Sequence, residues 1–140
     1  MSDAEDEVML GMRKLLTRLP AKDLERARAW YAEKLGLEPA EERPGGLRYV
    51  VGACEFALFT SAGASDGSFT QMGFEVEDLA ETVAELKRRG VVFEEYDEGF
   101  LRTVGGIATI PGNYPSKGSG EHAAWFRDSE GNMLGLGQPF

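Results

Sequence analysis

Residues 23–36, DLERARAWYAEKLG, carry a pattern that predicts an amphipathic helix with both of its ends marked. The apolar positions recur at steps of three and four residues and therefore share one face: Leu24, Ala27, Tyr31 and Leu35. Asp23 can cap the amino end, and Gly36 can take the left-handed conformation that ends a helix. A helix with one apolar face packs against a sheet, so strands are expected on both sides of it.

The same opening returns 55 residues later, where Asp78 begins a second helix that stops at Gly90. Its apolar face is formed by Leu79, Val83 and Leu86. Basic residues follow in the last turn, where they complement the negative end of the helix dipole: Lys87, Arg88 and Arg89. The chain therefore contains a weak internal repeat, with one amphipathic helix in each half.

Strand-like runs surround both helices and are separated by turn residues. They cover residues 14–19, 47–51, 54–61, 70–76, 91–96, 106–110, 122–127 and 133–138. The order is β-α-β-β-β twice, although one strand of the first unit has no clear pattern. We predict an α+β fold of two βαβββ modules, about 13–61 and 69–140, joined by a linker at 62–68. Residues 1–12 form an acidic tail, and residues 13–140 form a single domain.

Length and composition place the chain among ordinary globular proteins. It has 140 residues and a net charge of −9, which disfavours nucleic acid and anionic membrane surfaces as partners. The charge suits either a cationic ligand or, as the favoured interpretation, simple solubility. A lone cysteine, Cys54, excludes an intramolecular disulfide, and the acidic start differs from a basic signal peptide. We expect a cytoplasmic protein with no membrane segment.

The longest irregular stretch is residues 111–121, PGNYPSKGSGE. Loops of this length inside a compact domain often cover a ligand site. A plain surface connection rich in proline and glycine fits the pattern equally well.

Two stretches carry a family resemblance: DLERA leading through Trp30-Tyr31 to LGL at residues 35–37, and WFRDSEGN at residues 125–132. Together with the repeat, they resemble the vicinal oxygen chelate superfamily. Its members include glyoxalase I, bleomycin-resistance proteins, fosfomycin-resistance enzymes and extradiol dioxygenases. The resemblance implies that each sheet curls around a cavity with its helix outside.

The resemblance also implies where a metal would bind. The three ligand positions of the metal-dependent members fall on Leu16, Gln71 and Gly135, and two of these side chains cannot coordinate a metal. The whole chain has one histidine, His122, and one cysteine, so imidazole and thiolate ligands are scarce. We therefore expect no metal, no other cofactor and no glyoxalase I activity.

Alternation along strands then predicts a concave surface without its metal. Its candidate ligand-binding residues are Leu16, Arg18, Tyr49, Phe59, Gln71, Gly73, Glu75, Tyr114, His122, Trp125, Met133 and Gly135. For Arg18, an internal pair with Glu75 is favoured over an acid group on a ligand. Trp125 and Phe126 are adjacent, so only one can face the cavity, and the pattern does not decide which. A lone histidine such as His122 is more often structural than catalytic.

These observations favour a metal-independent small-molecule-binding protein of the glyoxalase and bleomycin-resistance type, which sequesters a drug or metabolite. The alternative is a metal-free isomerase or lyase whose acid–base groups would be Glu75 with His122 or Tyr114. A third possibility is an interaction module without a ligand. In each case we expect a homodimer, because cyclic dimers are the commonest closed assembly and modules of this family commonly pair between chains.

Overall fold

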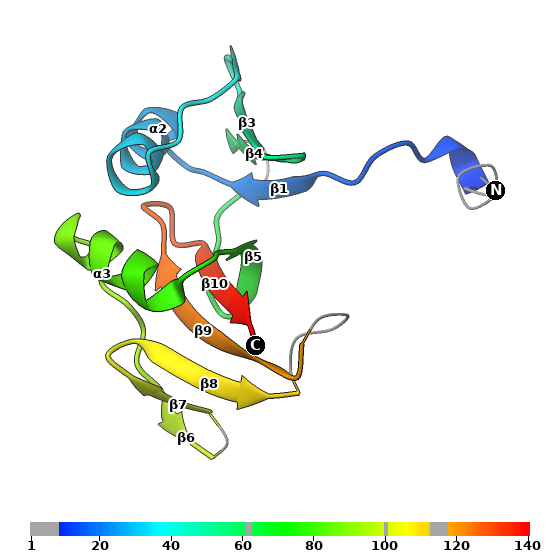
Figure 1. The fold of residues 1–140 in the computed structure, drawn as a ribbon. Helices are drawn as coiled ribbons and strands as arrows, with labels where there is room; N and C mark the ends of the chain where they lie inside the picture. Colours follow the sequence, from blue (N-terminus) through cyan, green and yellow to red (C-terminus); the bar gives the residue numbers. More distant parts are fainter. Residues whose placement is uncertain (1–8, 61–62, 100, 113–117) are drawn as a thin grey trace.

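The computed structural model describes residues 9–60, 63–99, 101–112 and 118–140, which form two sheets with one main helix each (Figure 1). The first module contains β1 (Thr17–Pro20), α2 (Leu24–Trp30), the π-helical segment η2 (Tyr31–Leu35), β2 (Glu41–Arg43), β3 (Gly46–Val51) and β4 (Cys54–Phe59). Its strand order is β1-β4-β3-β2, with β1 parallel to β4 and the other pairs antiparallel. A short 3-10 turn, η1 (Met9–Gly11), precedes this module.

The second module repeats this arrangement and extends it. It contains β5 (Thr70–Glu75), α3 (Leu79–Arg88), β6 (Asp97–Glu98), β7 (Leu101–Val104), β8 (Ile107–Pro111), β9 (Gly120–Arg127) and β10 (Met133–Pro139). The strand order is β5-β10-β9-β8-β7-β6, and β5 is parallel to β10. In both modules the first strand therefore pairs with the last, which confirms the α+β fold of two related units.

Both predicted helices form with the expected caps. The Asp23 carboxylate accepts a hydrogen bond of 3.0 Å from the Arg26 amide, and Asp78 does the same for Glu81 at 3.1 Å. Gly36 ends the first helix with φ of 70°, a conformation that a side chain would strain. Local chemistry is enough to define these ends, because each cap joins residues close in sequence.

Three strand predictions need correction. The unplaced strand of the first module is β2, whose three residues are too few to show a period. The predicted strand at 91–96 is absent apart from a single bridge between Phe93 and Phe126, and a hairpin of β6 and β7 extends the sheet instead. β1 begins at Thr17 rather than at residue 14, because Thr17 is where pairing with β4 begins.

The two modules share one apolar core on the helix side of the sheets. It joins residues of the first module to residues of the second, and all of the following are buried: Leu19, Tyr31, Tyr49, Phe56, Leu58, Leu79, Val83, Phe126 and Leu134. Aromatic rings pack between the modules: Trp30 is stacked on Phe126 at 6.2 Å between centroids, and Phe56 meets Phe74 edge-on at 6.3 Å. Neither sheet face would be covered by its own helix alone, so the halves fold as one unit. Among the described helices, none is long and apolar enough to cross a membrane.

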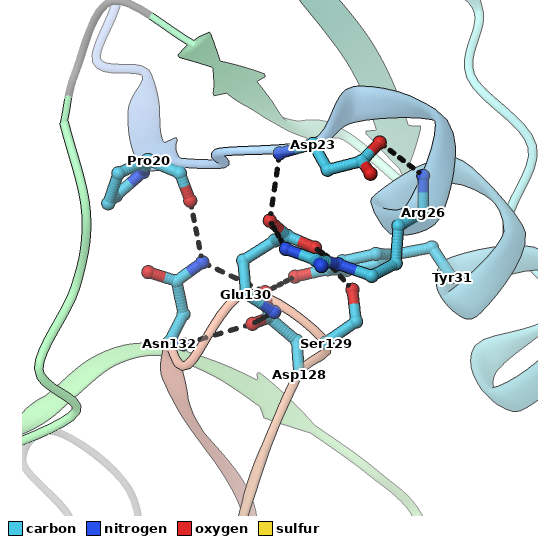
Figure 2. Close-up of polar contacts among 8 residues, drawn as sticks. All are labelled: Pro20, Asp23, Arg26, Tyr31, Asp128, Ser129, Glu130 and Asn132. Atoms are coloured by element: carbon cyan, nitrogen blue, oxygen red, sulfur yellow. Dashed lines mark hydrogen bonds and ion pairs between the residues drawn. The ribbon is translucent and has the colours of Figure 1, made fainter.

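The turn between β9 and β10 ties the modules together through polar contacts (Figure 2). The Asp128 carboxylate accepts hydrogen bonds from the backbone amides of Glu130 and Asn132, which closes the turn. Its other oxygen accepts a 2.6 Å bond from the Tyr31 hydroxyl and a 2.9 Å bond from the Asn132 amide. The Asn132 amide also donates to the Pro20 carbonyl at the end of β1.

Glu130 extends from the same turn to the start of α2. Its carboxylate receives two hydrogen bonds from the Arg26 guanidinium, at 2.8 and 2.9 Å, and one from the Asp23 amide (Figure 2). Burial alone would raise the pKa of Glu130, but the bonds from Arg26, Asp23 and Ser129 outweigh it and lower the pKa to about 2. The side chain is only 1% exposed, so its charge depends on these partners.

We expect Glu130→Gln to remove a stabilising contribution of at most about 3 kcal/mol at pH 7. A carboxyl whose pKa is depressed by folding stabilises the fold above its ordinary pKa, near 4.5, and loses that contribution as the pH falls through about 2. Urea unfolding from pH 7 to pH 2 should therefore show a shallower acid loss for Glu130→Gln than for the unsubstituted protein. Glu25→Gln, on the exposed side of α2, is the matched control. Identical acid profiles for the two variants would contradict this role.

Candidate functional site

The faces of the two sheets that turn away from the core carry the site. On β10, Leu134 and Leu136 point into the core, so Gly135 and Gly137 lie on the opposite face. On β4, Phe56 and Leu58 point into the core, so Ala57 and Phe59 lie on the opposite face. Among the described residues, a hollow lies on each of these faces, and the two hollows differ in chemistry.

The first, here called the glycine hollow, lies over β5, β9 and β10 and has a volume of about 430 Å³. Its floor is made by Gly73, Gly135 and Gly137, and its wall by Thr70 and Trp125. A Cβ atom at position 135 would lie 3.4 Å from the Thr70 methyl group and 3.5 Å from the Trp125 ring. Glycine therefore keeps this floor open while leaving ordinary contact distances around it.

The register of β9 decides which aromatic residue faces the hollow. Trp125 pairs with Gly135 and lies over the floor, whereas Phe126 pairs with Leu134 and is fully buried in the core. The Tyr96 ring meets the Trp125 ring edge-on, at 5.5 Å between centroids and 84° between planes. This contact restrains the indole at the edge of the hollow, where it can pack against a flat ligand.

The second, here called the arginine hollow, lies over β2, β3 and β4 and has a volume of about 440 Å³. Its apolar floor is formed by Leu16, Ala57 and Phe59. Arg18 borders this hollow through Phe59 and is not itself a lining residue: its guanidinium carbon lies 4.0 Å from the centroid of the Phe59 ring. This distance is typical of a cation–π contact.

Ion pairs cover the rest of this face. Glu41 accepts hydrogen bonds from Arg43 at 2.7 Å and from Arg48 at 3.0 Å, and these bonds lower the pKa of Glu41. Glu55 pairs with Lys14 at 2.9 Å and with Arg48 at 3.4 Å. Glu41 and Glu55 are therefore each paired with two basic side chains.

The favoured pairing of Arg18 with Glu75 is not found. Within the described parts of the chain, Arg18 makes no ion pair, and its neighbour is the Phe59 ring. The reason is topological: Arg18 pairs with Ala57 on β4, whereas Glu75 lies in the other sheet opposite Gly137.

Two predicted site residues lie away from the hollows. Tyr49 is fully buried between Tyr31 and Phe56, and burial raises its pKa to about 12. His122 lies on the helix side of β9, where its Nδ1 is 3.0 Å from the Thr109 hydroxyl. Strand alternation separates both of them from the concave faces.

Gln71 and Met133 have structural contacts at the start of their strands. The Gln71 side-chain oxygen accepts hydrogen bonds from the Ser65 hydroxyl and the Met133 amide, and its nitrogen donates to Asn132. Met133 itself is buried. Tyr114 and the centre of the 111–121 loop lie outside the described residues, so the lid remains a prediction.

The residues at the superfamily's metal positions do not fit a metal. Leu16 and Gly135 have no donor atom, and the Gln71 amide is already engaged by three partners. In the described ranges, no three histidine, cysteine, aspartate or glutamate side chains gather closely enough to hold an ion. No step of a mechanism can be assigned to a metal at these positions.

Sequence reasoning missed Thr70, which lines the hollow, and Tyr96, which packs against Trp125. Thr70 reaches the hollow because β5 has a bulge: Met133 pairs with Thr70, but Leu134 pairs with Met72, so Gln71 is an extra residue. Tyr96 comes from a segment predicted as a strand, and only its contact with Trp125 places it beside the hollow. Neither residue has a signal in the sequence that would have located it.

The sequence profile of the Glyoxalase/Bleomycin resistance protein/Dioxygenase superfamily matches residues 14–136. The chain belongs to this superfamily. The match covers both modules and extends through the turn at 128–132. No curated protein matches the chain significantly.

Solved structures of the superfamily fold resemble the chain along nearly its whole length. A glyoxalase/bleomycin resistance protein/dioxygenase from Alicyclobacillus acidocaldarius has a TM-score of 0.67 and 17% identity, covering 92% of this chain and 96% of its own. A bleomycin-binding protein in complex with bleomycin has a TM-score of 0.61 and 24% identity, covering 92% and 100%. TnmS3, an antibiotic-binding protein from a Streptomyces species, has a TM-score of 0.60 and 22% identity, covering 95% and 100%. At these identities the likeness concerns the fold.

Because Trp125 and Phe126 face opposite ways, truncating each to alanine should lower the free energy of unfolding by a different amount. Phe126→Ala should lower the free energy of unfolding by about 3–5 kcal/mol, because it leaves a cavity in the core. Trp125→Ala should cost about 1–2 kcal/mol, because the indole is only partly removed from water. Urea titrations followed by circular dichroism measure both. A larger loss for Trp125→Ala than for Phe126→Ala would reverse the assignment of faces.

Proposed function

We propose that this protein binds a small molecule on its concave faces without a metal, and that it sequesters a drug or metabolite. The observation that carries the proposal is the glycine hollow, an open floor walled by Trp125 at the position where metal-dependent relatives place a carboxylate ligand. A volume of about 430 Å³ suits a compact organic molecule. Structural neighbours that bind bleomycin and an antibiotic support this class of ligand.

The acid–base alternative has less support from the geometry. It requires Glu75 and His122 to approach one substrate, yet Glu75 borders the glycine hollow and His122 lies across the sheet beside α3. A general acid and a general base must both be within hydrogen-bond reach of the reacting atoms. Sequestration makes no such demand, since it needs only a fitting surface.

Ligand retention gives the direct test. Native mass spectra of protein purified without added metal, before and after incubation with a panel of antibiotics that includes bleomycin, should show a small molecule bound to the unsubstituted chain. Gly135→Leu should abolish this adduct, because the new side chain enters the hollow between Thr70 and Trp125. Ala53→Leu, in the exposed hairpin between β3 and β4, is the control. Elemental analysis should find well below one equivalent of zinc, nickel, manganese or iron.

Two results would overturn the proposal. A Gly135→Leu variant that remains folded and binds the same molecule unchanged would place the site elsewhere. A stoichiometric metal that is lost in Gln71→Ala would restore the metal-dependent interpretation.

We further propose that the protein is a homodimer. Residues 9–13 run away from the body of the molecule (Figure 1), and the segment from residue 9 to β1 exposes large apolar side chains: Leu10 at 89%, Met12 at 64% and Leu15 at 91%. Exposed apolar groups gathered on one segment are typical of a surface that a partner covers. A second copy of the chain is the proposed partner, because two-fold homodimers are the commonest closed assembly.

Light scattering coupled to gel filtration should therefore give a mass near twice the 15.3 kDa of one chain. The double substitution Leu10→Glu with Leu15→Glu should shift the equilibrium toward the monomer, because two charges would enter an apolar contact. Val92→Glu provides the control, because Val92 is an exposed apolar residue of the second module, outside the proposed contact segment. A monomer mass across a wide concentration range would reject the dimer.

A further inference from the structure

The two hollows differ in charge, and the difference identifies a ligand group. Among the described residues, the face around the arginine hollow carries four basic side chains, Lys14, Arg18, Arg43 and Arg48, against two acidic ones, Glu41 and Glu55. This local positive excess occurs in a chain whose net charge is −9. The residues that line the glycine hollow include two acids, Glu75 and Glu121, both of which have interactions of their own. A basic region in an acidic protein attracts anions locally, where the distances are shorter than the screening length of the solvent.

Arg18 is the basic group on this face that has no acid partner among the described residues. Glu41 is occupied by Arg43 and Arg48, and Glu55 by Lys14 and Arg48. The contact of Arg18 is the Phe59 ring, whose centroid lies 4.0 Å from the guanidinium carbon. A guanidinium has five N–H donors, and one contact with a ring leaves donors able to bind an anion.

We infer that the arginine hollow receives the anionic end of the ligand, a carboxylate or a group of similar geometry, on the edge of Arg18. The apolar body of the ligand would then lie over Leu16, Ala57 and Phe59, which form the floor. A guanidinium is suited to a planar carboxylate, since two parallel N–H groups match its two oxygens. This inference rests on the proposed function and adds the charge of the ligand to it.

Three naphthalene probes of one shape and different charge test the inference: naphthalene-2-carboxylate, naphthalene-2-carboxamide and 2-naphthylmethylammonium. Calorimetric titration of the unsubstituted protein should give an affinity for the carboxylate at least about tenfold higher than for the carboxamide, and higher still than for the ammonium. Arg18→Gln should abolish the preference for the carboxylate and leave carboxamide binding unchanged. Arg18→Lys should retain part of it, because the charge remains but the fork of donors is lost.

Arg88→Gln is the matched control, because it removes the same charge from an exposed arginine on α3. It should leave all three affinities unchanged. Equal losses in Arg18→Gln and Arg88→Gln, or equal affinities for carboxylate and carboxamide, would overturn the inference. Both arginines are exposed, so circular dichroism should show that each variant keeps its fold.

The outcomes also separate this inference from the proposed function. Tightest binding of the ammonium probe, lost in Gly135→Leu, would reject the anion site and leave a small-molecule site in the glycine hollow. If none of the probes binds but native mass spectra show a retained ligand, the anion site is likewise rejected and the small-molecule site is kept. If Gly135→Leu and Arg18→Gln both keep the retained ligand, the proposed site in the glycine hollow and the anion site are both rejected.

Discussion

The buried turn at residues 128–132 is the constraint on which the rest of the structure depends. Asp128 closes the turn and receives the Tyr31 hydroxyl, while Glu130 receives Arg26 from the start of α2. Asn132 joins the end of β1 to β5 through its bonds with Pro20 and Gln71. These groups would be costly to bury without partners, so they allow one relative placement of the modules where apolar packing alone would allow several. The modules therefore share a core on one side and leave their other faces open.

The open faces differ in chemistry although the four strands of the first sheet follow the same order as the first four strands of the second. The second module has small residues along β10 and an indole beside them, which makes a hollow with acidic borders. The first module has a guanidinium against the Phe59 ring and a network of basic side chains around an apolar floor. A repeated fold thus presents two surfaces of different chemistry, because the alternating positions of its strands are free to vary once the core positions are satisfied.

The positions that the family resemblance assigns to metal ligands hold residues with other contacts in this chain. The amide at one former ligand position, Gln71, now supports the turn, and the glycine at another, Gly135, opens the floor of a hollow. One of these positions thus supports the turn, and the other leaves space in the hollow. Function must be argued from such residues, since neighbours of 17–24% identity share the fold alone.

The sequence by itself determined the helices, their caps and the division into two related modules, because these depend on local spacing and on signals such as Asp23 and Gly36. It also determined that Leu16 and Gly135 could not bind a metal. Only the tertiary structure decided that Trp125 faces the hollow and that Tyr49 and His122 do not. Alternation predicts that neighbouring strand residues face opposite ways, but strand pairing decides which way each one faces. The bulge at Gln71 and the contact of Arg18 with Phe59 likewise depend on strands far apart in sequence, which no local pattern records.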